Sequence, residues 1–563
     1  MPEYRSRYQI RRLRRRTPAA LRRLENRRRI PDNSDSVKKP SPSITGLSNA
    51  PRGVVAAGHP ATAEAACRIL ETGGNAFDAT LAAFLTACVA EPMLASLGGG
   101  GFLLAHREDG QQVLYDFFTQ SPLRRRRGEV DFYPIEGDFG GTTQEFHIGY
   151  GSVACPGGVK GLFEVHGDLG SVPLWELAEP AVELARSGVE VNSFQAYIQR
   201  VLAPIVGSRE EIRRVFRWDD ETGTSIPAGA TFHLPEFADF LDTLSREGDD
   251  LFYRGEVARR LAEASRQGGG HLTAEDLSSY RVERRPPLVF GHGGARIATN
   301  PAPSSGGILI AFCLELLQSV AGDLGEFGSR RHVRALVESM ALTNQARRRL
   351  SADPQASLDP LLERTVLEDY RKILRKHASA TRGTTQISVA DGAGNLASLT
   401  LSNGEGSGIF LPGTGILLNN MLGEEDLNPG GFHAWPRNRR LSSMMAPTVL
   451  QHADGRRLAL GSGGSNRLRT AITQALVNFL DLDLPLEEAV IRPRLHFERG
   501  SLHMEPGFPE GTVRFLRETY PDHCLWGEPN LFFGGVHGAG HDPRRGIFFG
   551  ASDARRGGVA RYV

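Results

Sequence analysis

The sequence predicts a layered α+β fold in which sheets lie between helices. Short segments with strand-like alternation and turn residues follow residue 384, and strongly apolar helical segments occur towards both ends of the chain. With 563 residues, of which 40% are hydrophobic, the chain can bury a large core. Helices that bury one face against a sheet favour a sandwich, although periodicity alone does not separate it from other α/β or α+β folds.

Composition narrows the classes of function. The 66 basic and 65 acidic residues nearly cancel, so the net charge gives no reason to expect binding to nucleic acid or stable membrane insertion. The five cysteines are scattered and lack metal-ligand spacing, and no metal site is predicted. Cys67 and Cys88 fall within apolar helical patterns and are expected to be buried thiols.

The first fifty residues differ from the rest of the chain. Arginine-rich runs at 11–16 and 22–29 are followed by a Ser/Pro/Lys linker. One interpretation is a tail that binds an anionic membrane or nucleic acid. The favoured alternative is a disordered extension or an overlong start. Because this segment has no apolar run that could act as a secretion signal, a cytoplasmic location is expected.

From residue 53 the N-terminal part alternates short strands and helices. A strand at 54–57 precedes a helix at 62–70, for which Thr62 is the predicted N-cap. Residues 78–89 are almost entirely apolar and predict a buried helix, after which a glycine run leads into a strand at 102–105.

Similar patterns predict the remaining elements. Further helices are expected at 175–188, 257–267, 308–320, 333–350, 364–377, 468–479 and 486–491. Further strands are expected at 115–117, 295–299, 534–537 and 547–553.

The central stretch is the strand predicted at 384–391. The turn residues 391–394 join it to a second strand at 396–401 as a hairpin. Thr384 follows Gly383 after a segment that is predicted to be an exposed loop. A threonine hydroxyl needs a neighbouring base, which can be its own α-amine once the chain is cut before it. The alternative is an ordinary edge strand.

An ordered set of motifs surrounds this hairpin. Before residue 384 the motifs lie at 58–60, 73–79, 91–92, 98–102, 156–158, 252–255, 272–277 and 301–307. After it they lie at 402–408, 415–420, 440–444, 447–448 and 461–465. In this order and spacing they resemble the γ-glutamyltranspeptidase family of N-terminal-nucleophile hydrolases, which mature by self-cleavage. The resemblance runs from residue 53 to the C-terminus.

The resemblance implies a four-layer αββα sandwich and a division of the chain. Residues 1–50 would be the basic tail, 51–383 the large subunit and 384–563 the small subunit, and the two subunits would associate after cleavage. Thr384 would be the nucleophile and its freed α-amine the base. Ser402 matches a threonine whose hydroxyl bonds the nucleophile, and the backbone N–H groups of Gly464 and Ser465 match the oxyanion hole.

The resemblance also implies a substrate site. Asn403 matches a substrate-contacting asparagine, and Glu424 matches an aspartate that binds the substrate α-amine. Ser442 and Ser443 match a serine pair that holds the α-carboxylate of a γ-glutamyl group. The alternative for this pair is that its hydroxyls only satisfy the backbone of a turn.

Two further positions depart from the family pattern. Phe118 stands where relatives have an arginine that clamps the α-carboxylate, which removes a bidentate, charge-assisted contact. Met421 stands where relatives have Gln or Glu. The segment between Asn420 and Ser442 is shorter than in relatives with a full lid, which predicts a more open pocket. The arginines at 124–127 could replace the lost clamp, although a solvated loop is the favoured interpretation.

Three functions are compatible with these observations. The first is a self-processing hydrolase or transferase of γ-glutamyl amides such as glutathione, with water, an amino acid or a peptide as acceptor. The second acts on a different, apolar acyl amide, which Phe118 and Met421 would suit. The third is an inactive relative that serves as a binding protein, against which the intact Gly383–Thr384 junction argues. No cofactor is implied.

Overall fold

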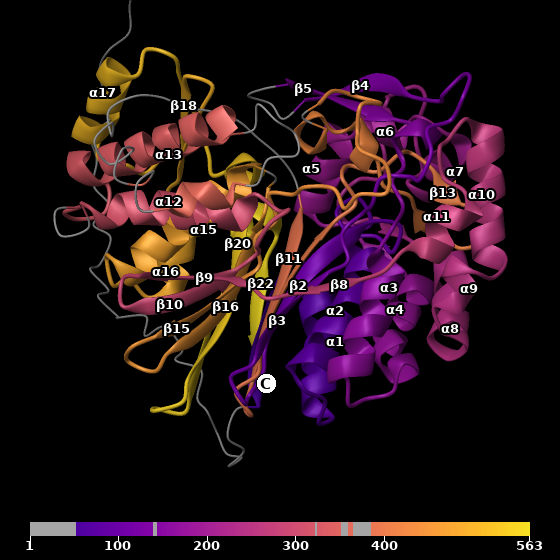
Figure 1. Ribbon diagram of the computed structural model, residues 1–563, viewed down its shortest axis with the longest axis horizontal. Coiled ribbons are helices and arrows are strands. Elements are labelled where there is room, and N and C mark those ends of the chain that lie inside the picture. The colour runs from indigo at the N-terminus through magenta and orange to yellow at the C-terminus, as the bar shows by residue number, and fades with distance from the viewer. Residues whose placement is uncertain are drawn as a thin grey trace, which may run out of the picture. The chain divides into compact units, whose positions relative to one another are not determined.

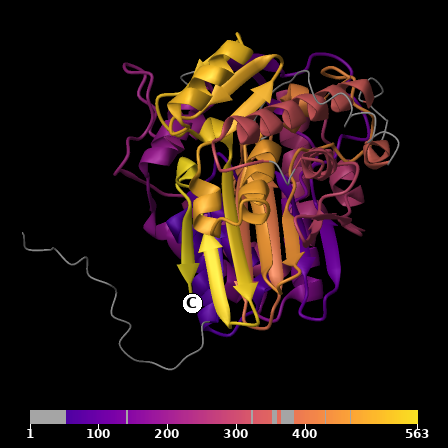
Figure 2. The same ribbon diagram turned by 90° about the vertical axis from the view of Figure 1, so that its left-hand side faces the viewer.

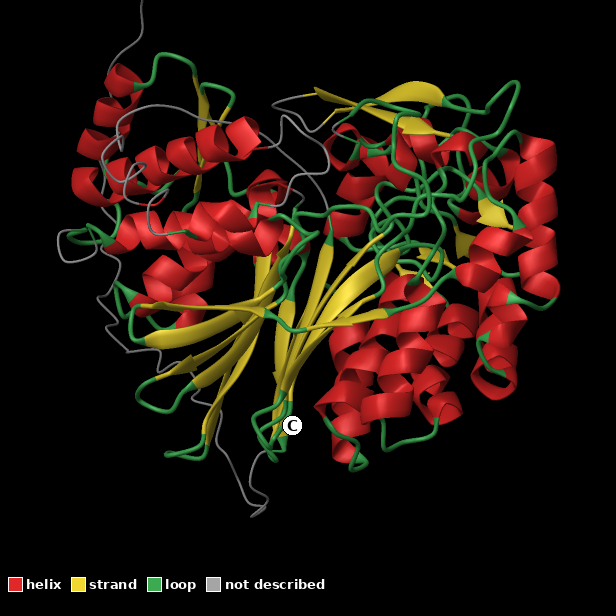
Figure 3. Cartoon of the chain, viewed as in Figure 1, coloured by secondary structure: helices red, strands yellow, loops and turns green. Residues whose placement is uncertain are grey.

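The computed structural model describes residues 52–138, 143–320, 324–350, 358–363, 367, 384–428, 430–464 and 466–563. Residues 50–563 form one compact unit, and the following description concerns this unit alone. Two sheets pack face to face between two layers of helices (Figures 1 and 3). The predicted four-layer αββα sandwich is therefore confirmed.

The first sheet contains the strand that follows Thr384. All its neighbouring strands are antiparallel. In spatial order the strands are β22 (Val559–Tyr562), β1 (Gly53–Ala57), β11 (Thr385–Asp391), β12 (Leu396–Ser402), β2 (Gly100–His106), β3 (Gln112–Asp116) and β8 (Glu283–Arg285). The predicted hairpin is confirmed, because Thr385 pairs with Leu401 across β11 and β12.

The second sheet covers the other face of β11 and β12. In order its strands are β21 (Ile547–Ala551), β20 (Gly535–Asp542), β16 (Arg457–Gly463), β15 (Thr448–His452), β10 (Ala295–Thr299) and β9 (Leu288–His292). The contact between the sheets is partly polar. The Ser388 hydroxyl of β11 donates to the His537 carbonyl of β20 at 3.0 Å, and the Ser398 hydroxyl of β12 donates to the Leu460 carbonyl of β16 at 2.8 Å. Such buried hydrogen bonds fix the register of the two sheets more specifically than apolar packing.

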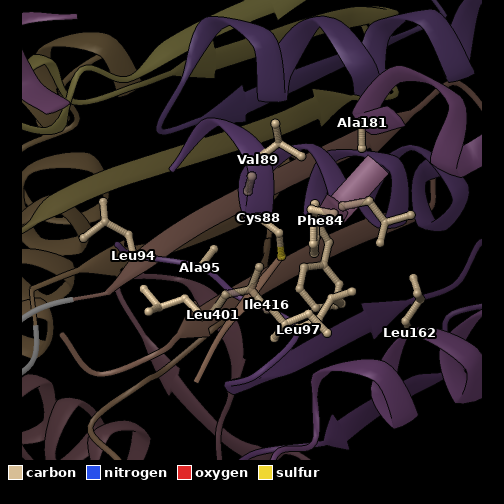
Figure 4. Packing of buried hydrophobic residues seen from close by; sticks show 14 of the residues in the cluster. Phe84, Cys88, Val89, Leu94, Ala95, Leu97, Leu162, Ala181, Leu401 and Ile416 are labelled. Atoms are coloured by element: carbon tan, nitrogen blue, oxygen red, sulfur yellow. The ribbon is translucent and has the colours of Figure 1, made fainter. Parts of the chain in front are cut away.

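The helices on the outer face of the first sheet are α1 (Pro60–Glu71), α2 (Ala76–Ala90) and α3 (Gly158–Leu169), with α4 (Leu174–Ser187) and α8 (Pro235–Glu247) behind them. Every residue of α2 is buried, as predicted for an all-apolar helix. In the close view of Figure 4, Phe84 and Cys88 of α2 lie beside Leu401 of β12 in the apolar layer between helix and sheet.

The predicted cap of α1 is wrong. The helix begins at Pro60, and the Nδ1 atom of His59 accepts from the N–H of Ala61 at 3.2 Å. Proline is favoured at the first helical position because its missing N–H would have no partner there. Thr62 instead lies inside the first turn, and its hydroxyl donates to Glu91 at 3.3 Å.

The second sheet has its own helical layer. It consists of α12 (Gly306–Gln318), α13 (Arg330–Leu350), α15 (Asn466–Leu480), α16 (Leu486–Ile491) and α17 (Glu510–Thr519). Figure 2 shows these helices in front of the strands. The helix predicted at 364–377 lies outside the described residues, apart from residue 367. No helix within the described ranges is long and apolar enough to cross a membrane.

Smaller elements surround the two sheets. The further helices are α5 (Ser193–Val201), α6 (Ala203–Val206), α7 (Glu210–Val215), α9 (Asp250–Tyr253), α10 (Glu256–Gly268) and α11 (Ala274–Ser279). The further strands are β4 (Tyr133–Asp138), β5 (Thr143–Ile148), β6 (Val189–Glu190), β7 (Thr231–Phe232), β13 (Phe410–Leu411), β14 (Ile416–Leu417), β17 (Leu495–Glu498), β18 (Ser501–Met504) and β19 (His523–Leu525).

Candidate active site

Thr384 immediately precedes β11 and is buried, with 4% of its surface exposed. Since Thr385 pairs with Leu401, continuing the register by one residue brings Thr384 opposite Ser402, the last residue of β12. Side chains directly opposite each other on antiparallel strands lie on the same face and in contact range. The register therefore brings the hydroxyl of Thr384 close to that of Ser402, as the resemblance to the family leads us to expect. Gly383 lies outside the described residues.

The turn after β16 lies against the carbonyl oxygen of Thr384. A Cβ atom added at Gly463 would lie 1.7 Å from this oxygen, so only glycine fits there. Gly464 follows with φ of +121° and packs against Gly534. This turn carries one of the two predicted oxyanion donors directly beside Thr384. Ser465, which carries the other, lies outside the described residues.

The loop after Ser402 is tightly folded. The Ser402 hydroxyl oxygen accepts from the N–H of Gly404 at 3.1 Å. A Cβ atom at Gly404 would lie 2.3 Å from a carboxylate oxygen of Glu424, so that carboxylate lies against the loop. Asn403 is fully buried, and within the described part of the chain neither atom of its amide has a hydrogen-bond partner. An unpaired buried amide costs free energy and is expected where a ligand supplies the missing bonds.

The serine pair bonds the protein backbone. The hydroxyl of Ser442 donates to the carbonyl of Pro303 at 2.9 Å, and the hydroxyl oxygen of Ser443 accepts from the N–H of Met445 at 3.0 Å. These contacts agree with the alternative of turn hydroxyls. They do not exclude a ligand, because each hydroxyl has one donor proton and two acceptor lone pairs. Ser443 can still donate its proton to a carboxylate.

The two departures from the family pattern lie in the core. Phe118 is 1% exposed and stacks on Phe102 with ring centroids 5.4 Å apart. Met421 is equally buried and belongs to the same apolar cluster. Both side chains pack against apolar neighbours in this cluster.

A buried arginine occupies the space beside Phe118. Arg440 donates to the Phe118 carbonyl at 2.5 Å and pairs with Asp116 at 3.2 Å. Its side chain is 4% exposed. This arginine therefore connects residues 116–118 to the loop that carries Ser442 and Ser443. Arg124, by contrast, is mostly exposed and pairs with Glu275, and Arg125 lies over the ring of Trp435.

Two buried charges next to the nucleophile had no predicted role. Glu91, which caps the C-terminal end of α2, accepts from the hydroxyl of Thr385 at 3.0 Å. Burial raises the pKa of Glu91 to about 7. Arg556 donates to the Thr384 carbonyl at 2.8 Å, and burial lowers the pKa of Arg556 to about 10. No local pattern could have revealed either contact, since the partners are 294 and 172 residues apart.

Acidic, histidine and cysteine side chains do not gather into a group able to hold a metal ion anywhere in the described ranges. The site brings together a threonine hydroxyl, a second hydroxyl opposite it and a glycine turn. On an αββα sandwich, these features define a threonine hydrolase of the N-terminal-nucleophile class.

A family model described as Gamma-glutamyltranspeptidase matches residues 62–563, and the chain belongs to that family. The chain is 31% identical over 486 residues to the Acylase ACY 1 proenzyme of Pseudomonas sp. strain V22, covering 83% of this chain and 86% of that protein. It is also 31% identical to the Glutathione hydrolase proenzyme of Pseudomonas aeruginosa over 480 residues, covering 79% and 83%. The cephalosporin acylase from Bacillus halodurans shares the fold, with a TM-score of 0.78 at 24% identity over 94% of this chain and 99% of that one.

The predicted family and class of enzyme are thus confirmed. Family membership supports an amidohydrolase of the γ-glutamyltranspeptidase or acylase type, and both of these relatives are named as proenzymes. The relatives of this chain include both acylases and glutathione hydrolases, so membership supports the type of reaction and leaves the acyl group to be argued from the site.

Proposed function

We propose that the chain cleaves itself before Thr384 and then uses Thr384 to hydrolyse or transfer the γ-glutamyl group of amides such as glutathione. The observation that carries this proposal is the position of Thr384 at the head of β11, opposite Ser402 and against the Gly463–Gly464 turn. Cleavage would divide the chain into a large subunit of residues 51–383, preceded by the tail 1–50, and a small subunit of residues 384–563.

In self-cleavage, the hydroxyl oxygen of Thr384 attacks the carbonyl carbon of Gly383. The peptide C–N bond breaks as the C–O bond forms, the α-nitrogen gains the hydroxyl proton, and an ester links the two parts. Water then hydrolyses the ester, which leaves a carboxylate on Gly383 and a free α-amine on Thr384.

In turnover, the neutral α-amine takes the proton of the Thr384 hydroxyl as its oxygen attacks the substrate amide. The developing oxyanion is stabilised by the N–H groups of Gly464 and Ser465, where one such donor contributes on the order of 3 kcal/mol. The amine product leaves with the proton, and an acyl ester remains on Thr384. Water completes hydrolysis, and an amino acid or peptide amine completes transfer. The hydroxyl of Ser402 holds the Thr384 oxygen in line for both steps.

For the substrate, Glu424 would pair with the α-amine of the γ-glutamyl group. Asn403 would supply the two unpartnered atoms of its amide, and Ser443 would donate its proton to the α-carboxylate. Ser442 would donate to the same carboxylate by exchanging its bond to the Pro303 carbonyl. Support comes from the buried, unsatisfied amide of Asn403 and from the Glu424 carboxylate beside the same loop.

A second candidate is an amidohydrolase for an acyl group without an α-carboxylate. One observation favours it: the residue in the position of the clamping arginine is Phe118, which lies in the core, and Arg440 beside it is already paired with Asp116. If the substrate were a γ-glutamyl amide, its α-carboxylate would therefore be held by the serine pair alone.

The first experiment compares the purified wild type with Thr384→Ala on a denaturing gel and by intact mass. Cleavage before Thr384 predicts fragments of 383 and 180 residues in the wild type and a single chain in the variant. An uncut wild type would overturn the assignment of the nucleophile. A cut in both proteins would show that an external protease acts instead.

The second experiment compares kcat/KM for three anilides whose acyl chains have the same carbon skeleton from the scissile carbonyl to the α-carbon. The γ-glutamyl anilide carries both α-groups, the glutaryl anilide lacks the α-amine, and the butyryl anilide lacks both. We expect at least a tenfold preference for the γ-glutamyl anilide over each of the others. Equal values, or a preference for the butyryl anilide, would support the second candidate.

A further inference from the structure

The strand that begins at the nucleophile has two different faces. The hydroxyl of Ser388 donates to the carbonyl of His537 in the second sheet, whereas Ile387 packs among the residues of α2. Because side chains alternate along a strand, Thr384 faces the second sheet and Thr385 faces the helices. A buried acid, Glu91, meets the helix-facing side.

A buried arginine meets the opposite side. Arg556 belongs to the short helix η7 (Ala554–Arg556), and its Nη1 atom donates to the Thr384 carbonyl at 2.8 Å. The α-nitrogen of Thr384 is only three bonds from that oxygen, so the guanidinium lies within about 6 Å of it. Cβ atoms at Gly463 and Gly464 would lie 3.0 and 3.4 Å from the same guanidinium. Arg556 therefore contacts the nucleophile residue and the oxyanion turn together.

The charges around Arg556 come from several elements. Those acting on it electrostatically are Glu91 from the end of α2, Asp553 and Arg494 from the C-terminal half, and Glu405 from the loop after β12. His537 of β20 also lies near, and burial lowers its pKa to about 4, which keeps this histidine neutral at physiological pH. Although burial lowers the pKa of Arg556 to about 10, its side chain stays charged near neutrality.

We propose that Arg556 is a positioning residue for the nucleophile: it holds the Thr384 carbonyl against the glycine turn, and its charge favours the neutral form of the freed α-amine. This inference rests on the proposed role of Thr384. A nearby cation disfavours protonation of an amine, and only the neutral amine can accept the hydroxyl proton. Glu91, from the other face, acts in the opposite direction once it is ionised.

The test is the pH dependence of kcat/KM between pH 5 and 9. An ordinary α-amine has a pKa of about 8, and activity rises with pH as the amine loses its proton. In Arg556→Met we expect this rise to move up by about one pH unit, which lowers kcat/KM about tenfold on its acidic side. Arg556→Lys keeps the charge and should show the rise within about 0.3 unit of wild type.

The control is Arg469→Met, which removes another buried arginine. Arg469 lies on α15 and pairs with Glu498 at 3.0 Å. This variant should lose stability and keep the wild-type pH dependence. Because the pKa of Glu91 lies within the pH range of the assay, the comparison is repeated in a Glu91→Gln background. There, replacing Arg556 by methionine should still move the rise of kcat/KM to higher pH.

Five outcomes decide the matter. The proposal is supported if the rise of kcat/KM with pH moves up in Arg556→Met and lies at the wild-type pH in Arg556→Lys. It is also supported if Arg556→Met no longer cleaves itself and Arg556→Lys does. Cleaved variants with an unmoved rise overturn the role of Arg556 and leave that of Thr384 intact. Loss of cleavage in both variants, with a fall in melting temperature equal to that of Arg469→Met, assigns Arg556 to structure and overturns the role. An uncut wild type overturns the nucleophile and, with it, the role of Arg556.

Discussion

The two ends of the site differ in how far they follow the pattern of the family. At the nucleophile end, the strand register places Ser402 opposite Thr384. The glycine turn packs so closely against the Thr384 carbonyl that a side chain at Gly463 would not fit. At the recognition end, the buried Phe118 stands where the resemblance leads us to expect an arginine, and the serine pair bonds the protein backbone. Under the proposed roles, bond cleavage depends on backbone geometry, whereas recognition of the acyl group depends on side chains that can change without altering the fold.

The largest effect is expected at the nucleophile end, from Gly463→Ala. Its Cβ atom would lie 1.7 Å from the Thr384 oxygen, so the turn must move. Since a displacement of about 1 Å can cost a hundredfold, and loss of an oxyanion donor up to a thousandfold, kcat/KM should fall on the order of a thousandfold. Gly291→Ala in β9 is the control, because its Cβ atom would meet nothing closer than 3.9 Å. Near wild-type activity in Gly463→Ala would show that the turn is not part of the site.

At the recognition end, Phe118→Arg tests whether an arginine at this position can act as the clamp that the resemblance implies. Because Phe118 is in the core against Phe102, a charge placed there would lack a partner, and we expect the free energy of unfolding to fall by roughly 3 kcal/mol. Phe118→Leu is the apolar control and should cost less than about 1.5 kcal/mol. Urea unfolding in the uncut Thr384→Ala background measures both. A stable Phe118→Arg with higher kcat/KM for the γ-glutamyl anilide would place residue 118 in the pocket after all.

The outcome for Phe118 shows where inference from the sequence stops. Local patterns predicted the helix at 486–491 with its observed bounds, because Pro485 and Pro493 delimit it. The hairpin after Thr384 was predicted equally well, since turn residues and alternation are both local signals. Whether Phe118 faces the pocket or the core depends on Phe102 and Arg440, and the latter is 322 residues away.

Helix caps and buried side-chain hydrogen bonds are harder still to predict from the sequence. The sequence favoured Thr62 as the cap of α1 because threonine is a common cap, but Pro60 makes the helix start earlier. The contact of Glu91 with Thr385 depends on how the end of α2 meets β11. Buried pairs of this kind arise from packing between distant segments, and neither residue carries a local mark of it.

A smaller effect is expected from the acid at the nucleophile end. In the folded chain Glu91 keeps its proton up to a pH of about 7, whereas in the unfolded chain it loses the proton near its ordinary pKa of 4.5. Its contribution to stability is therefore present below pH 4.5 and lost as the pH rises to about 7, by roughly 3 kcal/mol at most. In the Thr384→Ala background, Glu91→Gln should remove this decline in urea unfolding between pH 5 and 8. The exposed Glu275→Gln is the control, and an equal decline in all three proteins would contradict the assignment.

The smallest effect is expected from Asn403→Leu, which should change substrate recognition without changing the free energy of unfolding. Asn403 makes no hydrogen bond through its amide within the described ranges, so Asn403→Leu should leave the free energy of unfolding within about 0.5 kcal/mol of the parent. Without the amide, kcat/KM for the γ-glutamyl anilide should fall about tenfold and that for the butyryl anilide should stay unchanged, which fits the roughly 1.5 kcal/mol of one hydrogen bond to a charged group. Asn478→Leu provides the reverse case, because the amide nitrogen of Asn478 on α15 donates to the Ala489 carbonyl of α16 at 3.1 Å. This second variant should lose stability and keep both activities. If Asn403→Leu instead lost stability and affected the two anilides equally, Asn403 would belong to the scaffold, and the γ-glutamyl group would have to be held by Glu424 and the serine pair alone.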